Sequence, residues 1–528
     1  MSNDYFNQLK SACAEGDIEN LDKLLIEADQ QLISLNELLI LIRSCLRAYQ
    51  WPQVYGLFNK ALSVKKDLNA ELQHWLTLPE LNDQLEVKQK LIDQAVKAQT
   101  HLNGLLALGL FYRDSDLFTS AEQLFLQLIE HVPGDIRAYH RLITVYIRTQ
   151  RYHDAIACCQ LALNIDARSV TALYNFGVAN VSLNRESEAL EKFNKTLEIA
   201  PDNHWAHLQI AQIQLKQGNF TQGWQQYEWR KVIYQKKAND LATVYPEWTG
   251  QNLEGKSILV WADQGLGDII MYAGFFKQLL RLGCTLSVMA EPRLKNIFER
   301  SFSIQYFYPE LITSEQQIKH RIDYQIPISG LGARFVHSFS DFSAQDSYLR
   351  VDQTRSEKIK NTLMQQASGK RLVGLSWRGG VVDTRKHARC IPLEKWRFLF
   401  KRKDCVFVNL QYDSNTHESS QFSQWGGINL DLNHKQDIDG VASALNTIDL
   451  LISVDNSSAH FAGALGTEVW NLLPYSGEWR WFLDSEKSYW YQSMRLFRQK
   501  TPDDWAYSLA SIYQALTNKH VNKDSAVG

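Results

Sequence analysis

The sequence predicts an α + α/β protein in which a helical solenoid precedes two parallel α/β halves. Three observations predict this fold class. A 34-residue repeat runs over residues 102–230, the composition changes near residue 235, and strand–helix–strand patterns follow residue 257 and span Leu450 to Pro474. At 528 residues the chain is too long for one hydrophobic core, so we expect roughly three or four domains or subdomains.

The composition excludes several classes of function. Lys and Arg total 56 and Asp and Glu total 58, so a net charge of −2 gives no electrostatic reason to expect nucleic acid or an anionic membrane as a partner. The seven Cys are scattered without a metal-type CxxC, which indicates free thiols in a reducing compartment. The N-terminus is too polar for a signal peptide, and no apolar run reaches the roughly 18 residues of a transmembrane helix. We therefore expect a cytoplasmic protein.

The repeat is defined by four unit starts, at Leu102, Ile136, Val170 and His204. One position in each unit is small and the position four residues later is large in most units. The small set is Ala121, Ala155, Ala189 and Gly223, and the later set is Phe125, Cys159, Phe193 and Tyr227. Small residues allow two helices to cross closely while large ones fill the groove beside them, so we expect stacked helical hairpins over 101–238. Residues 1–100 have helical spacing and indicate divergent, weakly repetitive hairpins.

The stretch from Leu450 to Pro474 predicts a strand, a loop, a helix and a second strand. Leu450–Val454 is apolar like a buried parallel strand, and Val469–Leu473 is the next strand. Ser457 and Ser458 are good helix N-caps, and Gly466 stands where a C-cap belongs.

Asp455 and His460 then fall at the carboxyl end of a parallel strand, beside a helix N-terminus where anions bind. An ordinary capped helix with a structural histidine is the alternative.

The first α/β half begins after a linker over 239–256. Strands are expected at Ile258–Trp261, Thr285–Met289, Ile304–Tyr308 and Tyr324–Ile328, and a helix over Ile269–Leu282. The loop before this helix holds Gln264, Gly265 and Gly267 but does not form the dinucleotide GxGxxG fingerprint. Asp268 ends this loop, either as a functional carboxylate or as an N-cap, and the helix position should keep it ionised.

The second half begins after the polar segment 352–370. Strands are expected at Leu372–Trp377 and at Val406–Leu410, which ends at Gln411, and helices over Ile438–Thr447 and from about Trp505 to Leu516. Basic residues follow the first of these strands, at Arg378, Arg385, Lys386, His387 and Arg389. They could neutralise a diphosphate or form a solvated loop. The aromatic residues at 479–481 and 490–491 are expected in the core.

An ordered set of motifs carries a family resemblance. ADQGLGDII, LSWRGG, RCIPL, VDNSSAHFAGALG and WRWFLD…WYQSMRLFRQ stand behind the repeat array. This arrangement resembles bacterial glycosyltransferases fused to tetratricopeptide repeats. They are similar to heptosyltransferases and more distantly to O-GlcNAc transferases, and some members modify flagellin. The resemblance covers about residues 100–517, and as an ordered set the motifs are specific.

The resemblance implies a tetratricopeptide-like solenoid followed by a GT-B fold of two Rossmann-like halves. It places the N-terminal half at 257–366, the donor-binding half at 367–517 and a flexible tail at 518–528. Asp268 matches the general base of the family, and Asp455 and His460 match the residues that hold the donor. Together with the residues argued from the sequence above, the donor-binding set expected is Arg378, Arg389, Gln411, Asp455, Ser457, Ser458 and His460. The sequence departs from the family pattern at Asp263, Cys390 and Asn456, where relatives often show Glu, Ser and Thr.

The function expected is a metal-independent, inverting glycosyltransferase that needs no cofactor. It would move a sugar from a nucleotide-sugar donor to a protein acceptor held by the repeats, with flagellin as one candidate. The alternatives are a non-catalytic repeat adaptor whose α/β part senses a sugar or nucleotide, and a heptosyltransferase-like lipid-glycan transferase. Because the repeat register ends before the linker, we also expect a fragment starting near Gln235 to keep the donor site.

Overall fold

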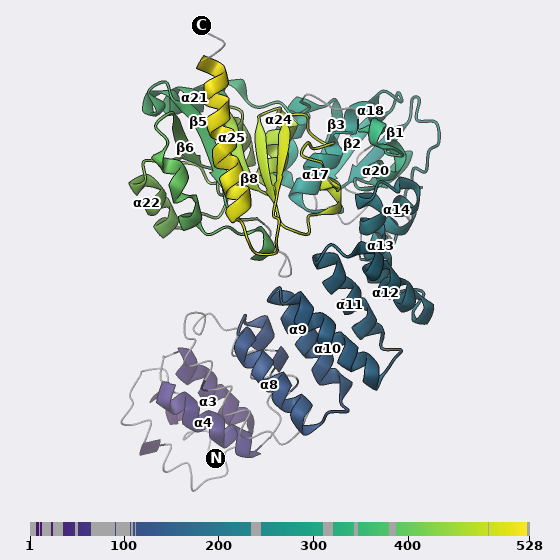
Figure 1. Cartoon of the computed structure of the whole chain (residues 1–528), viewed down its shortest axis with the longest axis vertical. Helices are drawn as coiled ribbons and strands as arrows, with labels where there is room; N and C mark the ends of the chain where they lie inside the picture. Colours follow the sequence, from purple (N-terminus) through teal and green to yellow (C-terminus); the bar gives the residue numbers. More distant parts are fainter. Residues whose placement is uncertain are drawn as a thin grey trace. The chain divides into compact units, whose positions relative to one another are not determined.

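The computed structural model describes residues 112–233, 244–309, 320–342, 347–379, 387–483 and 485–524, and parts of the first 110 residues, of which 35–47 and 51–64 are the longest (Figure 1). The chain divides into two compact units, Met1–Phe176 and Gly177–Gly528. Among the described residues no helix is long and apolar enough to cross a membrane.

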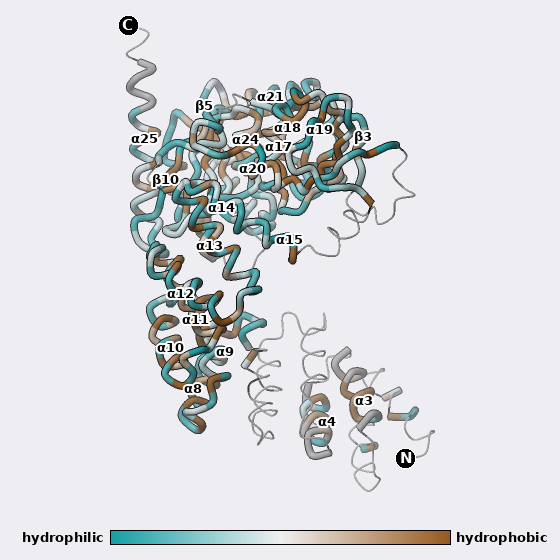
Figure 2. The backbone as a smooth tube through the Cα atoms, turned by 90° about the vertical axis from the view of Figure 1, so that its right-hand side faces the viewer, coloured by the Kyte–Doolittle hydropathy of each residue, from teal (hydrophilic) through white to brown (hydrophobic). Residues whose placement is uncertain are grey.

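The first unit consists of helices. They are α3 (Leu35–Arg47), α4 (Trp51–Val64), α8 (Phe118–His131), α9 (Ile136–Arg148) and α10 (Tyr152–Ile165), followed by the start of α11 (Val170–Ser182). The hairpin predicted within residues 1–100 is seen where α3 packs on α4. Apolar and polar residues alternate along the repeat helices, as Figure 2 shows in brown and teal. In α8 the buried residues Ala121, Leu124, Phe125 and Leu128 recur at helical spacing, as expected for one packed face.

The predicted repeat register is confirmed. Helices α9, α11 and α13 (His204–Lys216) begin at Ile136, Val170 and His204, whereas Leu102 lies outside the described residues. The large residues of the repeat, Phe125 and Phe193, pack against glycines at another small position, Gly109 and Gly177. A Cβ atom on Gly177 would lie 2.5 Å from the ring of Phe193, and a Cβ on Gly109 would meet Phe125, its equivalent in an earlier unit.

The second unit begins with repeat helices and continues into two parallel sheets. The remaining repeat helices are α12 (Glu186–Ile199), α13, α14 (Phe220–Tyr227) and α15 (Arg230–Ile233). The first sheet has the order β3-β2-β1-β4, with β1 (Ser257–Trp261), β2 (Thr285–Ala290), β3 (Ile304–Pro309) and β4 (Tyr324–Pro327). Its helices are α17 (Leu266–Ala273), α18 (Phe276–Leu280), α19 (Lys295–Ser301) and α20 (Gly330–Phe335).

The second sheet has six parallel strands in the order β10-β9-β8-β5-β6-β7. The strands are β5 (Arg371–Ser376), β6 (Cys405–Asn409), β7 (Ile428–Asn429), β8 (Leu450–Val454), β9 (Val469–Leu473) and β10 (Met494–Arg498). The helices are α21 (Gln353–Ala367), α22 (Thr416–Gln424), α23 (Ile438–Leu445), α24 (Ser457–Leu465) and α25 (Ala506–Asp524). Short 3₁₀ segments include η5 (His387–Arg389), η6 (Leu393–Lys401) and η7 (Trp479–Trp481). The predicted fold class is confirmed: helical repeats precede two parallel α/β sheets.

Several boundaries differ from the sequence prediction. The helix expected over 269–282 is interrupted at Gly274, where the ring of Tyr348 approaches so closely that a Cβ would lie 3.3 Å from it. The polar segment 352–370 contains α21, and β7 and β10 were not predicted. The last helix continues to Asp524, so it includes part of the predicted tail, of which residues 525–528 lie outside the described residues.

The hydrophobic core does not stop at the end of the repeats. Leu208, Phe220 and Trp224 belong to the same buried cluster as residues of both sheets. Trp224 donates its indole N–H to the carbonyl of Val336 at 2.8 Å and packs edge-on against Trp479, with ring centroids 5.5 Å apart. The predicted domain limits remain predictions. The expectation that a fragment from Gln235 keeps the donor site also stays a prediction, and the core that the cut would divide argues against it.

A buried ion pair also joins the last repeat helix to the first sheet. The Arg230 guanidinium lies 3.1 Å from a carboxylate oxygen of Asp263, just after β1, and both side chains are almost fully buried. Ser329 completes the group, because its hydroxyl and its backbone N–H both donate to Asp263. The loop that leads to Asp268 therefore starts at a residue held by the repeats.

Candidate functional site

The candidate site lies where the carboxyl end of β1 and the carboxyl end of β8 meet. Helix α17 follows β1, helix α24 follows β8, and these two helices pack against each other (Figure 1). The contact is close, because a Cβ on Gly267 would lie 2.9 Å from the imidazole of His460. The predicted loop of the first half and the predicted donor helix of the second half are thus brought together.

Asp268 lies in the first turn of α17 but does not cap it. The N-cap residue is Gly265, so the N-cap interpretation of Asp268 is wrong. Its Oδ1 atom instead accepts a hydrogen bond of 2.6 Å from Nη2 of Arg480. The side chain is 21% exposed, so it is partly buried. Gly265 is exposed, whereas Gln264 is half-buried.

The ionisation of Asp268 is set by burial more than by the helix. Burial raises the pKa of this carboxyl above its ordinary value, the Arg480 guanidinium lowers it, and the neighbouring carboxylates raise it again. The expectation that its place at the helix N-terminus keeps Asp268 ionised stays a prediction, and burial acts against it. A carboxylate with a raised pKa is a stronger base than an ordinary aspartate once it is ionised.

Helix α24 begins at Ser457, as predicted, but its cap is Asn456. The Asn456 side chain accepts from the N–H of Ala459 at 3.2 Å and donates to the Ser376 hydroxyl at 2.8 Å. Ser457 and Ser458 are thus the first helical residues and not the caps, with Ser458 buried. Gly466 ends the helix with φ of 82°, which confirms the predicted C-cap.

His460 is a buried, neutral imidazole. Its side chain is 2% exposed, its Nδ1 atom is hydrogen-bonded to the Tyr491 hydroxyl at 2.9 Å, and its ring stacks on Trp481. Burial, followed by the positive charges of Arg480 and Arg389, holds the pKa of His460 well below its ordinary value. At neutral pH the ring can therefore donate or accept a hydrogen bond without bringing a charge.

Asp455 and Arg389 are charged groups with unused hydrogen-bonding atoms. Asp455 is 1% exposed, and its Oδ2 atom lies 3.9 Å from Nη1 of Arg389. Among the described residues neither Asp455 Oδ2 nor Arg389 Nε has a hydrogen-bond partner. Buried charged atoms without partners are costly, so this arrangement is typical of a site that a polar ligand completes.

Two predicted donor-binding residues have other contacts. Arg378 forms ion pairs with Asp413 and Glu418. Gln411 accepts hydrogen bonds from the backbone N–H groups of Trp377 and Arg378, at 2.8 and 2.9 Å. Both side chains thus hold the carboxyl end of β5 in place, and their contact with a donor stays a prediction. Residues 380–386, with Arg385 and Lys386, lie outside the described residues.

Sequence reasoning missed Arg480, Trp481 and Tyr491, because the aromatic residues around them were assigned to the core. That assignment is correct for Trp479 and Trp481, which are 4% and 1% exposed. The sequence signal that could have indicated this part of the site is Arg480, which stands between Trp479 and Trp481. A guanidinium in an apolar segment must find an anionic partner, and here the partner is Asp268.

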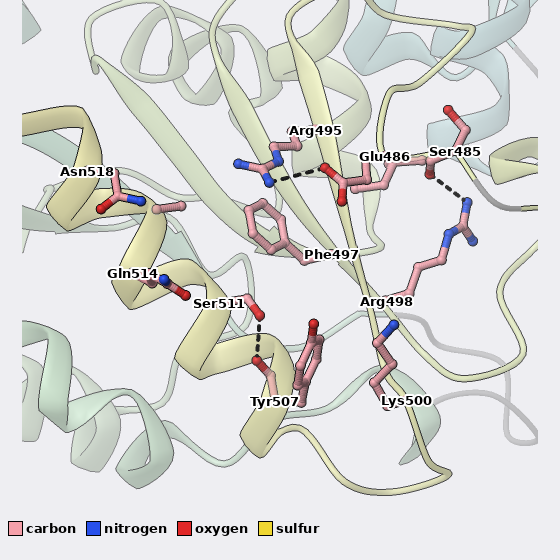
Figure 3. Close-up of a pocket in the computed structure, with 12 residues that line it drawn as sticks. Ser485, Glu486, Arg495, Phe497, Arg498, Lys500, Tyr507, Ser511, Gln514 and Asn518 are labelled. Carbon is pink, nitrogen blue, oxygen red and sulfur yellow. Dashed lines mark hydrogen bonds and ion pairs between the residues drawn. The ribbon is translucent and has the colours of Figure 1, made fainter. Parts of the chain in front are cut away.

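A separate hollow of about 510 Å³ lies between β10 and α25 (Figure 3). An ion pair between Arg495 and Glu486 borders it, and Arg498 donates to the carbonyl oxygens of Trp481 and Ser485. No predicted site residue lines this hollow. It is therefore distinct from the cluster around His460.

Comparisons with known proteins agree with the helical part of this description. A tetratricopeptide repeat family model matches residues 134–202. Protein FlbA of Caulobacter vibrioides is 24% identical over 441 residues, which is 73% of each chain. Among solved structures, a glycosyl transferase family 9 protein of Veillonella parvula is 14% identical, with 47% of this chain and 87% of that chain covered and a TM-score of 0.37. MamA is 22% identical, with coverages of 30% and 97% and a TM-score of 0.26.

Proposed function

We propose that this chain is a glycosyltransferase that uses a nucleotide-sugar donor and a protein acceptor. The observation that supports it most is the contact between α17 and α24, which brings Asp268 close to His460 and Asp455. A base on one half and a polar ligand site on the other are the two parts that sugar transfer requires. The order of motifs along the sequence supports the same assignment.

The proposed reaction uses residues of both halves. The acceptor hydroxyl attacks the anomeric carbon of the donor, and its proton passes to Asp268. The bond between that carbon and the phosphate oxygen breaks, and the electron pair leaves with the nucleotide. Arg389 and the first turn of α24 would stabilise the charge that develops on the phosphate, without a metal ion. Asp455 and His460 would hold the donor by hydrogen bonds.

The acceptor is proposed to be a protein because repeat helices precede the α/β part. Tetratricopeptide-type solenoids commonly expose a concave surface that grips peptides or proteins. The resemblance to flagellin-modifying enzymes makes flagellin the first acceptor to test.

The first experiment identifies the donor. Thermal shifts of the full chain are measured with UDP-, GDP-, ADP- and CMP-sugars, because a ligand that binds the native state raises its melting temperature. The same screen is run on His460→Ala. We expect one nucleotide class to raise the melting temperature of the wild type and to have a much weaker effect on the folded variant. An equal shift in both proteins would contradict the donor assignment.

The second experiment tests the chemistry with Asp268→Asn. We expect donor affinity to stay within a few-fold and turnover to fall by roughly 10²–10⁴, the usual effect of losing a general base. Asp202→Asn, which changes an exposed aspartate of the repeats, is the matched control and should transfer at the wild-type rate. Near-wild-type turnover of Asp268→Asn would remove Asp268 from the mechanism. Donor binding by the wild type without any transfer would favour the adaptor alternative.

A further inference from the structure

Arg480 is the residue that fixes the orientation of Asp268. It lies in η7, between β9 and β10, whereas Asp268 lies in α17 beyond β1. Its Nη2 atom donates to Oδ1 of Asp268 at 2.6 Å, and its side chain is only 12% exposed. The backbone is fixed as well, because the carbonyl oxygen of Arg480 accepts from the indole of Trp490 at 3.0 Å. The ion pair therefore joins a rigid aromatic segment to the proposed base.

The other charged groups that face Asp268 are carboxylates, and two of them have an arginine of their own, Arg389 beside Asp455 and Arg230 beside Asp263. Glu478 precedes η7, Asp455 follows β8, and Asp263 follows β1, where Arg230 already neutralises it. Three buried tyrosines complete the surroundings, Tyr227 from the last repeat, Tyr272 from α17 and Tyr491 before β10. Among the described residues Arg480 is thus the cation that compensates Asp268 directly. Without it the carboxylate would face other carboxylates in a buried place, and it would take up a proton more readily.

The two carboxylate oxygens of Asp268 differ in their hydrogen bonds. Oδ1 is occupied by Arg480, while no hydrogen bond to Oδ2 is found among the described residues. A carboxylate held by one oxygen keeps the other at a fixed position. A base held at a fixed position increases the transfer rate by a large factor, because the acceptor hydroxyl must lie within hydrogen-bond distance of it.

We propose that Arg480 is the positioning residue of the transfer reaction: it holds Oδ1 of Asp268, keeps that carboxylate ionised, and presents Oδ2 to the acceptor hydroxyl. This inference rests on the proposed function. In the transfer step Oδ2 takes the acceptor proton while Arg480 keeps its own protons and remains paired with Oδ1. Arg480 therefore acts through Asp268 and has no contact with the reacting atoms.

The pH dependence of transfer distinguishes this role from a structural one. Rates are measured from pH 5.5 to 9 for the wild type, Arg480→Gln and Arg480→Lys. In Arg480→Gln we expect the acidic limb of kcat/KM to move to higher pH by about one unit or more, so that transfer at low pH falls about tenfold further than transfer at pH 9. Arg480→Lys, which restores a charge, should return the limb towards its original position. Arg495→Gln, on an exposed arginine of β10, is the control and should leave the profile unchanged.

A double-mutant cycle makes the ion pair testable without an assay of transfer. Melting temperatures at pH 8 are compared for the wild type, Arg480→Gln, Asp268→Asn and the double variant. We expect Arg480→Gln to lower the melting temperature by much less in the Asp268→Asn background, because its partner charge is already gone. Equal losses of melting temperature in both backgrounds would overturn the positioning role even if the wild type transfers sugar. An Arg480→Gln transfer rate that falls by the same factor at every pH would overturn it as well. A wild type that transfers no sugar would instead overturn the proposed function, and the positioning role with it.

Discussion

Removing Arg230 should show that the last repeat is part of the α/β core. In the variant Arg230→Met the chain keeps an apolar side chain of similar length but loses the guanidinium that pairs with Asp263. Arg230 is 2% exposed and Asp263 is 5% exposed, so water cannot replace the lost partner. The hydrogen bonds from Ser329 remain, but they do not supply a positive charge.

The expected loss in the free energy of unfolding of Arg230→Met follows from the burial of this ion pair. Breaking a buried ion pair at one end leaves an uncompensated charge and costs about 3–5 kcal/mol. Lys231 is the neighbouring control, because its ion pair with Glu247 is 29% exposed on both sides. Such a pair contributes at most about 1 kcal/mol, so Lys231→Ala should have little effect. The double variant Arg230→Met/Asp263→Asn removes both charges and should recover part of the loss.

Urea unfolding followed by tryptophan fluorescence is a suitable assay. Trp51 and Trp75 are the two of the 15 tryptophans that precede residue 177, so the signal reports mainly on the second unit. The shift of the unfolding midpoint, multiplied by the slope, gives the change in the free energy of unfolding. A loss for Arg230→Met no larger than that for Lys231→Ala would refute the reasoning, because the pair would then contribute no more than a surface contact.

Two further predictions concern packing and pH. Gly177→Ala should destabilise the protein by about 1–3 kcal/mol, because the new methyl group would lie 2.5 Å from the Phe193 ring, whereas Gly56→Ala in α4 meets open space and should not destabilise it. Urea midpoints by circular dichroism compare the two, and equal effects would contradict the packing argument. The pKa of His460 is lowered on folding, so its contribution to stability is complete above the unfolded value of 6.5 and is lost as the pH falls below it. Between pH 7.5 and 5.5 the wild type should therefore lose more free energy of unfolding than His460→Gln, by roughly 1.4 kcal/mol for each pH unit crossed below 6.5. Urea midpoints at the two pH values measure the difference, and equal losses would show that His460 is not buried as a neutral ring.

Local patterns were enough to predict the fold class. The starts of three repeat helices and both ends of β8 and β9 follow from spacing and apolar runs, because these elements are buried in the way their sequences indicate. The interruption at Gly274 was not predictable in the same way. It depends on Tyr348, which is 74 positions away in the sequence and reaches the helix only in the folded chain.

The site was predicted in part for a related reason. Asp268, Asp455 and His460 stand at strand ends, and that position marks them in the sequence. Arg480 stands in an aromatic segment after β9, so its role appears only when η7 approaches α17. Arg378 was expected at the donor as part of a basic cluster and Gln411 as the residue that ends a strand. Their contacts with Asp413, Glu418 and the β5 backbone depend on the loop after β6. Contacts between distant segments are what the one-dimensional pattern does not contain.

The shared core of Trp224, Tyr227 and Arg230 with the sheets restricts how the repeat array can change in length. A 34-residue unit inserted or deleted before Gly177 leaves these three residues in the chain. Deletion of the unit that contains them would remove the cation that Asp263 needs and the indole bound to Val336. Recombination of repeats should therefore be tolerated at the amino-terminal end and selected against at the other. Chimaeras intended to redirect acceptor choice should accordingly be joined before residue 177, with the last repeat kept as a fixed adaptor.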